Sequence, residues 1–197
     1  MALSSDLVKL FRCGIVRSTP LTLNYNFKEF DCGNNDLNDF LLSDSKIYLR
    51  HLRYTTTIID TEDQILAYYS LANDLLNITD KEDFQQEMDI ENSKIHPDYW
   101  EKFLNQKMYP AVKLGRLAVH KDYQCNGMGE FILQSLTHSF VNNNKTGCQF
   151  LTIDAINDHK EQRALNFYEK QGFKYLTVRD IGEPSRAMYK SLIECIL

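Results

Sequence analysis

The spacing of apolar residues changes within residues 114–139, and this change limits the folds open to the chain more than any other feature. The stretch begins with closely spaced apolar residues, as a buried strand does, and this run ends at Val119. After a polar corner with Gly127 and Gly129, apolar residues recur at helical spacing, at Met128, Phe131, Ile132 and Leu136. A change from strand-like to helical spacing predicts a strand–loop–helix unit.

The two glycines give the predicted loop a specific chemistry. Gly127 and Gly129 can adopt backbone angles closed to other residues, and they carry no side chain that would block a ligand. The first turn of the following helix has backbone N–H groups without an intrahelical acceptor, and the helix dipole favours negative charge there. The loop therefore predicts a main-chain site for an anion such as a pyrophosphate. The simpler interpretation is that both glycines only shape a tight turn.

The spacing of apolar residues and the positions of turn-forming residues predict the other helices and strands. We expect strands at residues 21–26, 54–59, 64–71, 111–119, 149–155, 173–178 and 186–192, with 54–59 and 64–71 as a hairpin. We expect helices over 37–52, 79–104, 128–136 and 158–171. Asn34 or Asn35 is the expected cap of the first helix, and Asp158 and Gly172 are the expected ends of the last. This order of elements predicts a mixed α/β (α+β) layer with a mostly antiparallel sheet.

Two sequence blocks carry a family resemblance. Gln124-Cys125-Asn126-Gly127-Met128-Gly129 follows the apolar strand, and Asn157 is followed by Ala164-Leu165-Asn166-Phe167-Tyr168-Glu169-Lys170-Gln171-Gly172-Phe173. The first block matches Gln/Arg-x-x-Gly-x-Gly/Ala, and together they resemble the GNAT superfamily of N-acetyltransferases. The resemblance implies a mostly antiparallel central sheet with helices on both faces. It also implies one domain over residues 1–197, with an N-terminal extension at 1–19 and an inserted helical segment at about 79–109.

The resemblance also implies a site for acetyl-CoA as cosubstrate, without a metal. The strand end at Leu117, Ala118 and Val119 would bind the pantetheine arm and the thioester through its backbone. The loop would bind the pyrophosphate, with Gln124, Asn126, Gly127 and Gly129 as the named contacts and Cys125 and Met128 between them. Asn157 would contact the arm.

Tyr168 would lie near the thioester sulfur, where a phenol can donate a proton to the leaving thiolate. The simpler alternative is an aromatic side chain packed under the sheet. The base that takes the proton from the amine is left open between Asp154, Glu130, His120 and water. His120 is expected as a surface turn residue.

A narrower resemblance concerns the substrate. Residues 30–41, Ala67–Leu71 and Leu114–Val119 resemble the acetyltransferase toxins of bacterial toxin–antitoxin pairs, which acetylate the amino group of aminoacyl-tRNA. The chain departs from that branch at Cys125 and Asn126, where Gly and a basic residue are usual, and in an acidic stretch at 79–91. Its net charge of −5 favours a cationic acceptor.

We therefore expect direct acetyl transfer to a primary amine, with a small cationic amine or a protein amine as the favoured acceptor. The alternatives are toxin-type acetylation of aminoacyl-tRNA, for which Lys46, Arg50, His51 and Arg53 supply a basic run, and a non-catalytic acyl-CoA-binding module. A homodimer and an antitoxin are further partners left open by the resemblance.

Composition predicts the compartment. No apolar run is long enough to cross a membrane, and the first 19 residues lack the apolar centre of a signal peptide. The five cysteines are scattered without a Cys-x-x-Cys pair, and the histidines show no metal-binding spacing. These features predict a cytoplasmic protein with reduced thiols and no membrane or metal partner.

Overall fold

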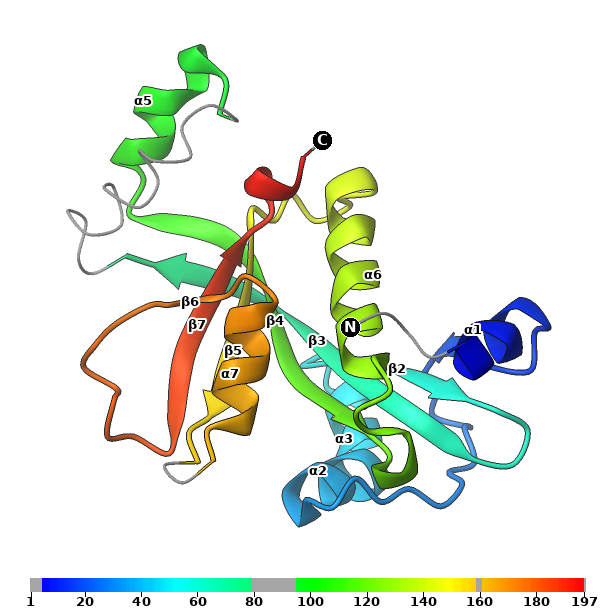
Figure 1. The fold of residues 1–197 in the computed structure, drawn as a ribbon. Helices are drawn as coiled ribbons and strands as arrows, with labels where there is room; N and C mark the ends of the chain where they lie inside the picture. The colour runs from blue at the N-terminus through cyan, green and yellow to red at the C-terminus, as the bar shows by residue number, and fades with distance from the viewer. Residues whose placement is uncertain (1–4, 79–94, 159–160, 197) are drawn as a thin grey trace. The chain divides into compact units, whose positions relative to one another are not determined.

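The computed structural model describes residues 5–78, 95–158 and 161–196 of the chain (Figure 1). The chain forms two compact units, the first from Met1–Ala72 and Leu114–Ser135, the second from Asn73–Lys113 and Leu136–Leu197. A single domain over residues 1–197 stays a prediction. Part of the predicted insertion, residues 79–94, lies outside the described residues.

Seven strands form one sheet in the order β1-β2-β3-β4-β5-β7-β6. Their bounds are β1 Arg17–Pro20, β2 Thr55–Asp60, β3 Ile65–Asn77, β4 Met108–Val119, β5 Phe150–Ile156, β6 Lys174–Tyr175 and β7 Ser185–Ser191. β4 and β5 are parallel, over the pairs from Ala111–Phe150 to Lys113–Thr152. The pairs β1–β2, β2–β3, β5–β7 and β6–β7 are antiparallel. The predicted mixed, mostly antiparallel α+β fold is confirmed.

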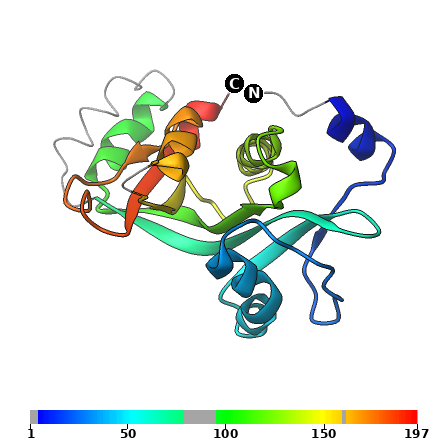
Figure 2. The same ribbon diagram turned by 60° about the horizontal axis from the view of Figure 1, so that its bottom comes forward.

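In the first unit, helices cover both faces of the predicted hairpin β2–β3 (Figure 2). On one face lies a nearly continuous helical segment of α2 (Asn35–Asp39), the π-helix η1 (Phe40–Asp44) and α3 (Ser45–Arg50). The predicted cap is Asn34, whose Oδ1 accepts a bond of 3.2 Å from the N–H of Leu37. The start of α6 (Met128–Asn142) lies on the other face, and α1 (Ser5–Arg12) contacts it through the Phe11 and Phe131 rings.

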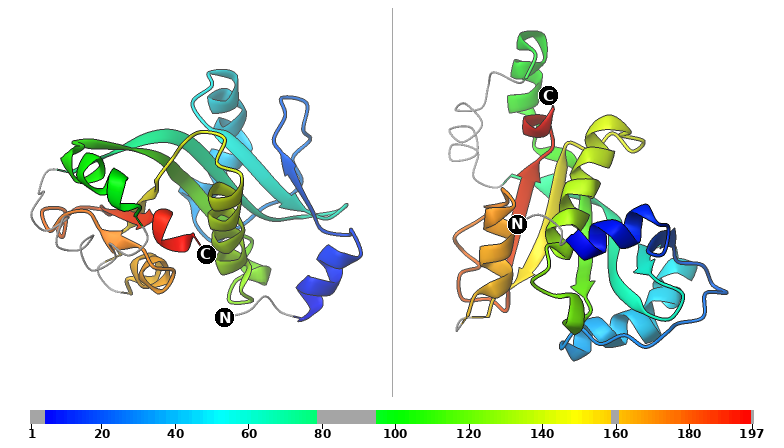
Figure 3. Two further views of the ribbon diagram at one scale, coloured as in Figure 1. Left: turned by 90° about the horizontal axis from the view of Figure 1, so that it is seen from above. Right: turned by 45° about the vertical axis from the view of Figure 1, so that its right-hand side comes forward.

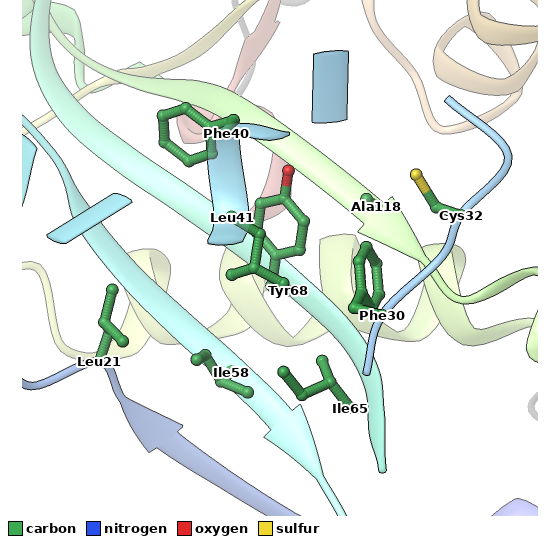
Figure 4. Close-up of a cluster of buried hydrophobic side chains, with 9 residues drawn as sticks. All are labelled: Leu21, Phe30, Cys32, Phe40, Leu41, Ile58, Ile65, Tyr68 and Ala118. Atoms are coloured by element: carbon green, nitrogen blue, oxygen red, sulfur yellow. The ribbon is translucent and has the colours of Figure 1, made fainter. Parts of the chain in front are cut away.

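The first core cluster joins the hairpin to the helical segment (Figure 4). Its buried members are Leu21, Phe30, Cys32, Phe40, Leu41, Ile58, Ile65, Tyr68 and Ala118. Tyr68 of β3 lies at its centre, and its hydroxyl donates to Leu37 O of α2 at 2.7 Å. The hydrogen bond satisfies the one polar atom that this ring brings into the core.

In the second unit, β5 and β7 lie side by side, and α7 (Arg163–Lys170) packs against β5 (Figure 3). The second core cluster consists of Leu76, Ile78, Ile95, Phe103, Tyr109, Ala111, Phe150 and Tyr189. Phe103 comes from α5 (Pro97–Asn105), which His96 caps by accepting from Asp98 N. The helix therefore begins at Pro97, directly after its cap, within the predicted helical range 79–104.

Three predicted elements differ from the structure. The outer strand is Arg17–Pro20 rather than 21–26, because Leu21 turns into the first cluster and its N–H bonds Thr56 O. The last helix begins at Arg163, and its N-cap is Gln162 in the left-handed region, so the predicted cap Asp158 is wrong. β6 has two residues where 173–178 was expected. The described residues also include the short 3₁₀ turns η3 (Lys121–Tyr123) and η4 (Ile193–Cys195).

Candidate functional site

The glycine loop makes a tight corner between β4 and α6 in the first unit. Two of its residues have left-handed backbone angles, Cys125 with φ 60° and Gly127 with φ 79°. The N–H of Phe131 donates to Gly127 O at 2.9 Å as a helical bond. The amides of Met128 and Gly129 precede that bond, so they belong to the helix turn whose N–H groups have no intrahelical acceptor. This geometry suits an anion.

The side chains at both ends of the loop turn away from the corner. Gln124 Nε2 donates to Cys32 O at 2.8 Å and to Val119 O at 2.9 Å. The Met128 side chain is 1% exposed and belongs to the core. Cys125 and Asn126 are exposed. The predicted pyrophosphate contact of Gln124 can therefore come only from its backbone or from a displaced side chain, because its amide group holds the loop.

Tyr168 lies on α7 in the second unit, with a half-buried side chain. Its ring centroid is 5.1 Å from that of Phe167 and 5.4 Å from that of Phe173. The predicted helix stop is confirmed: Gly172 has φ 82°, and Phe173 N donates to Tyr168 O at 3.0 Å. Burial raises the pKa of Tyr168, because it disfavours the phenolate. The hydroxyl therefore keeps its proton at neutral pH and is chemically suited to act as an acid.

Asn157 is buried at the end of β5, with 7% of its surface exposed. Its Nδ2 donates to Ile181 O and to Glu183 O, both at 2.9 Å. Its main-chain N–H bonds Pro184 O. The side-chain donors thus fasten the turn before β7, which leaves Oδ1 as the side-chain atom that a pantetheine amide would have to use.

The predicted site residues fall into two groups. Leu117, Ala118 and Val119 at the end of β4 lie in the first unit with the loop from Gln124 to Gly129. Asn157 and Tyr168 lie in the second unit. The structure therefore brings the predicted pyrophosphate and strand-end residues together at one corner, and the assignment of all these residues to acetyl-CoA stays a prediction.

His120 corrects one prediction. It was expected as a surface turn residue, but it is only 6% exposed. Its Nε2 lies 3.1 Å from Gln64 Nε2, and its Nδ1 accepts from Asp122 N at 3.3 Å. Its ring also meets Phe30 edge to face. His120 thus serves as a buried support of the turn that leads into the loop, because its ring bonds on both nitrogens.

The other two candidate bases are engaged as well. Asp154 forms an ion pair with Lys113. Glu130 accepts a bond of 3.1 Å from Gln134. The structure adds a carboxylate that sequence reasoning missed: Asp74 of β3, which accepts a 2.5 Å bond from the buried hydroxyl of Thr152. The expected strand ended at residue 71, so no pattern placed Asp74 in the sheet.

Helical membrane spans and clusters of metal-binding side chains are absent from the described part of the chain. No helix there combines the length and the apolar character needed to cross a bilayer. Residues 5–78, 95–158 and 161–196 hold no group of three or more His, Cys, Asp or Glu side chains arranged for a metal ion.

Comparisons with known proteins match part of the chain to a family model. Residues 90–175 match the family model described as "Acetyltransferase (GNAT) domain". This range contains the glycine loop and Tyr168. No curated protein matches the chain.

Solved structures show the same fold. A mutant of KacT is 22% identical, with a TM-score of 0.68 over 91% of this chain and 98% of that chain. A mutant of the AtaT toxin, bound to the C-terminus of the antitoxin AtaR and acetyl-CoA, is 23% identical, with a TM-score of 0.64 over 92% and 97%. AtaT complexed with acetyl-methionyl-tRNAfMet is 23% identical, with a TM-score of 0.65 over 89% and 94%.

These matches confirm the predicted resemblance to GNAT acetyltransferases. The family model covers residues 90–175, which include the glycine loop, and the solved structures extend the fold likeness over most of the chain. Within residues 90–175 the chain is similar to the GNAT acetyltransferase domain, and its fold is similar to that of the KacT and AtaT structures.

Proposed function

We propose that this protein transfers the acetyl group of acetyl-CoA to the amino group of an aminoacyl-tRNA. The observation that carries the proposal is the fold likeness to AtaT complexed with acetyl-methionyl-tRNAfMet, which extends over 89% of this chain. This ranking reverses the preference for a small cationic amine or a protein amine that was based on net charge. Net charge describes the whole chain, whereas an acceptor is bound by a local surface.

Acetyl-CoA is the proposed donor. The main-chain amides of Met128 and Gly129 would bind its pyrophosphate, supported by the positive end of the α6 dipole. The backbone at Leu117 and Val119 would bind the pantetheine arm. Support comes from the loop geometry, in which Gly127 has a positive φ and the first helical bond is donated by Phe131, and from the similar fold that was solved with acetyl-CoA.

The proposed chemistry is a direct attack. The neutral amine forms a C–N bond with the thioester carbonyl, and the C–S bond then breaks. The proton of the amine passes to a base, and the Tyr168 hydroxyl gives its proton to the departing sulfur. Backbone N–H groups at the end of β4 would stabilise the oxyanion. The Tyr168 hydroxyl is protonated at working pH, as a proton donor must be, and burial raises its pKa and so makes it a weaker acid.

The proposed base is a carboxylate of the second unit, either Asp74 or Asp154. Asp74 is held by the Thr152 hydroxyl, and Asp154 is paired with Lys113. A direct comparison of Asp74→Asn with Asp154→Asn separates them. The base variant should lose ~10²-fold or more in kcat, in line with general base contributions. Equal, small losses in both variants would instead favour water as the proton acceptor.

A tRNA acceptor requires a basic surface. The end of α3 and the following turn expose Arg50, His51 and Arg53, while Lys46 is engaged with Tyr25 O at 2.6 Å. The double variant Arg50→Glu/Arg53→Glu should weaken tRNA binding at least ten-fold in a gel shift at moderate salt, because it reverses two phosphate contacts. The control is Lys102→Glu/Lys107→Glu on the exposed side of the second unit, which changes net charge equally.

The function itself is tested by the acceptor. Release of the CoA thiol should require acetyl-CoA and be fastest with charged tRNA, compared with polyamines and peptides. Faster release with polyamines would establish the second candidate, acetylation of a small cationic amine, which the net charge of −5 supports. Binding of acetyl-CoA without turnover on any acceptor would instead indicate a non-catalytic acyl-CoA-binding module.

The fold likeness to AtaT also supports a proposal about the partners of this protein. An antitoxin that covers the enzyme is the expected partner, as for the AtaT toxin bound to AtaR. A homodimer is a further proposed partner state. The five free cysteines support a reducing, cytoplasmic location.

A further inference from the structure

Residues 30–38 lie against the glycine loop. They belong to the stretch that resembles the toxin branch, and the proposed chemistry does not use them. The main-chain N–H of Lys121 donates to Asp31 O at 2.9 Å. The side chain of Gln124 donates to Cys32 O at 2.8 Å. Two residues that lead into the corner are therefore bonded to the main chain of consecutive residues, which fixes the corner against this segment.

Asp31 makes three further contacts through its carboxylate. It accepts from Gly33 N at 2.8 Å, from Asn38 Nδ2 at 3.0 Å and from Lys121 Nζ at 2.9 Å. The Lys121 ammonium, with the Gly33 and Asn38 donors, holds the pKa of this carboxyl far below its usual range. The charged form of Asp31 is thus the bonded form at any physiological pH.

Asn38 links this carboxylate to α2. Its Oδ1 accepts from Cys32 N at 3.0 Å and from Cys32 Sγ at 3.1 Å, while its Nδ2 serves Asp31. Asn38 belongs to α2, and Phe40 two residues later is a member of the first core cluster. The contacts therefore run from the packed core through Asn38 and Asp31 to the turn before the loop.

We propose that Asp31, Asn38 and Gln124 form a positioning device that fixes the loop for the pyrophosphate of the acyl donor. The inference rests on the proposed acetyl-CoA site. A loop with Cys125 and Gly127 at positive φ has many competing conformations when unsupported, and a preorganised loop binds without that ordering cost.

The sign of one mutational effect separates positioning from charge. Removing a negative charge close to an anion site should strengthen binding of an anionic ligand if Asp31 acts by charge alone. If Asp31 positions the loop, Asp31→Ala should weaken it. We expect KM for acetyl-CoA to rise about ten-fold with little change in kcat, as loss of charge-assisted bonds predicts. Asp31→Asn keeps acceptors for Gly33 and Asn38 and should recover most of the loss.

A second acyl donor shows whether the loss concerns the pyrophosphate site alone. S-acetylpantetheine carries the thioester but no pyrophosphate, so its kcat/KM should be unchanged in Asp31→Ala. Gln124→Leu, which removes the two donated bonds, should give the same selective loss. The control is Lys28→Met, which breaks the 2.7 Å ion pair with Asp60 elsewhere in the first unit and should leave both donors unaffected.

The outcomes are distinct. Equal losses with both donors would mean a general structural role and would overturn the inference, as would unchanged or tighter acetyl-CoA binding in both variants. A wild-type protein that gives no calorimetric heat with acetyl-CoA would instead overturn the proposed function itself.

Discussion

The two core clusters are built alike, yet among the described residues only the first is linked by hydrogen bonds to the glycine loop. Each has a buried tyrosine on a strand whose hydroxyl donates at 2.7 Å to a helix carbonyl: Tyr68 to Leu37 O in the first, Tyr109 to Phe103 O in the second. Both rings are no more than 1% exposed. The same device therefore fastens α2 in the first unit and α5 in the second.

The difference lies in what the fastened helix carries. In the first cluster, α2 also supplies Asn38, which bonds Asp31 and Cys32 beside the glycine loop. In the second, α5 brings aromatic rings: Phe103 lies 4.9 Å from Tyr109, and Trp100 stacks on Phe103. Damage to the first cluster should therefore weaken acetyl-CoA binding at the glycine loop, while damage to the second should lower stability and leave that binding unchanged.

The largest expected effect is the loss of stability in Phe103→Ala and Phe40→Ala, which truncate one buried ring in each cluster. Both rings are buried, so each truncation should lower the free energy of unfolding by about 3–5 kcal/mol through lost burial and a cavity. At a temperature where both variants remain folded, calorimetry should show weaker acetyl-CoA binding only for Phe40→Ala. Equal weakening in both would remove the proposed distinction.

The two tyrosines make a milder version of the same comparison. Tyr68→Phe and Tyr109→Phe should each cost about 0.5–1.5 kcal/mol in urea unfolding, because each removes one hydrogen bond. The two carbonyls each keep a main-chain donor, Phe40 N for Leu37 O and Gln106 N for Phe103 O. KM for acetyl-CoA should rise in Tyr68→Phe, since Leu37 O lies next to Asn38 in α2, and stay constant in Tyr109→Phe. A constant KM in both variants would mean that α2 holds its place without the Tyr68 bond.

Sequence patterns predicted these regions unequally, for physical reasons. The loop, α6 and the stop at Gly172 were predicted because local rules specify them: helical period, missing side chains and positive φ. A tertiary contact decided the burial of His120 against Gln64. The same holds for Gln124, whose motif matched while its amide bonds Cys32 O, far away in the chain.

Tyr168 differs from the tyrosines of the two clusters, because its hydroxyl is proposed to donate a proton in the reaction. Tyr168→Phe should leave acetyl-CoA affinity and unfolding nearly intact and cut turnover ten-fold or more, as loss of a general acid does. Single-turnover kinetics with the best acceptor measures this. Full turnover in the variant would make Tyr168 a packing residue between Phe167 and Phe173, like the tyrosines of the two clusters.

The smallest expected effect is a loss of stability at alkaline pH. Burial raises the pKa of Tyr109 from 10.0 to about 12 and also raises that of Tyr68. A group with a raised folded pKa contributes its full stability below its unfolded pKa and loses it as pH rises toward the folded value. The free energy of unfolding should therefore fall by about 1 kcal/mol per buried tyrosine between pH 10 and 11. Tyr109→Phe and Tyr68→Phe should each flatten the slope by one tyrosine's share, because the two clusters bury the phenol in the same way. A slope unchanged by either variant would mean that the alkaline loss comes from other groups, and the likeness between the clusters would then stop at geometry.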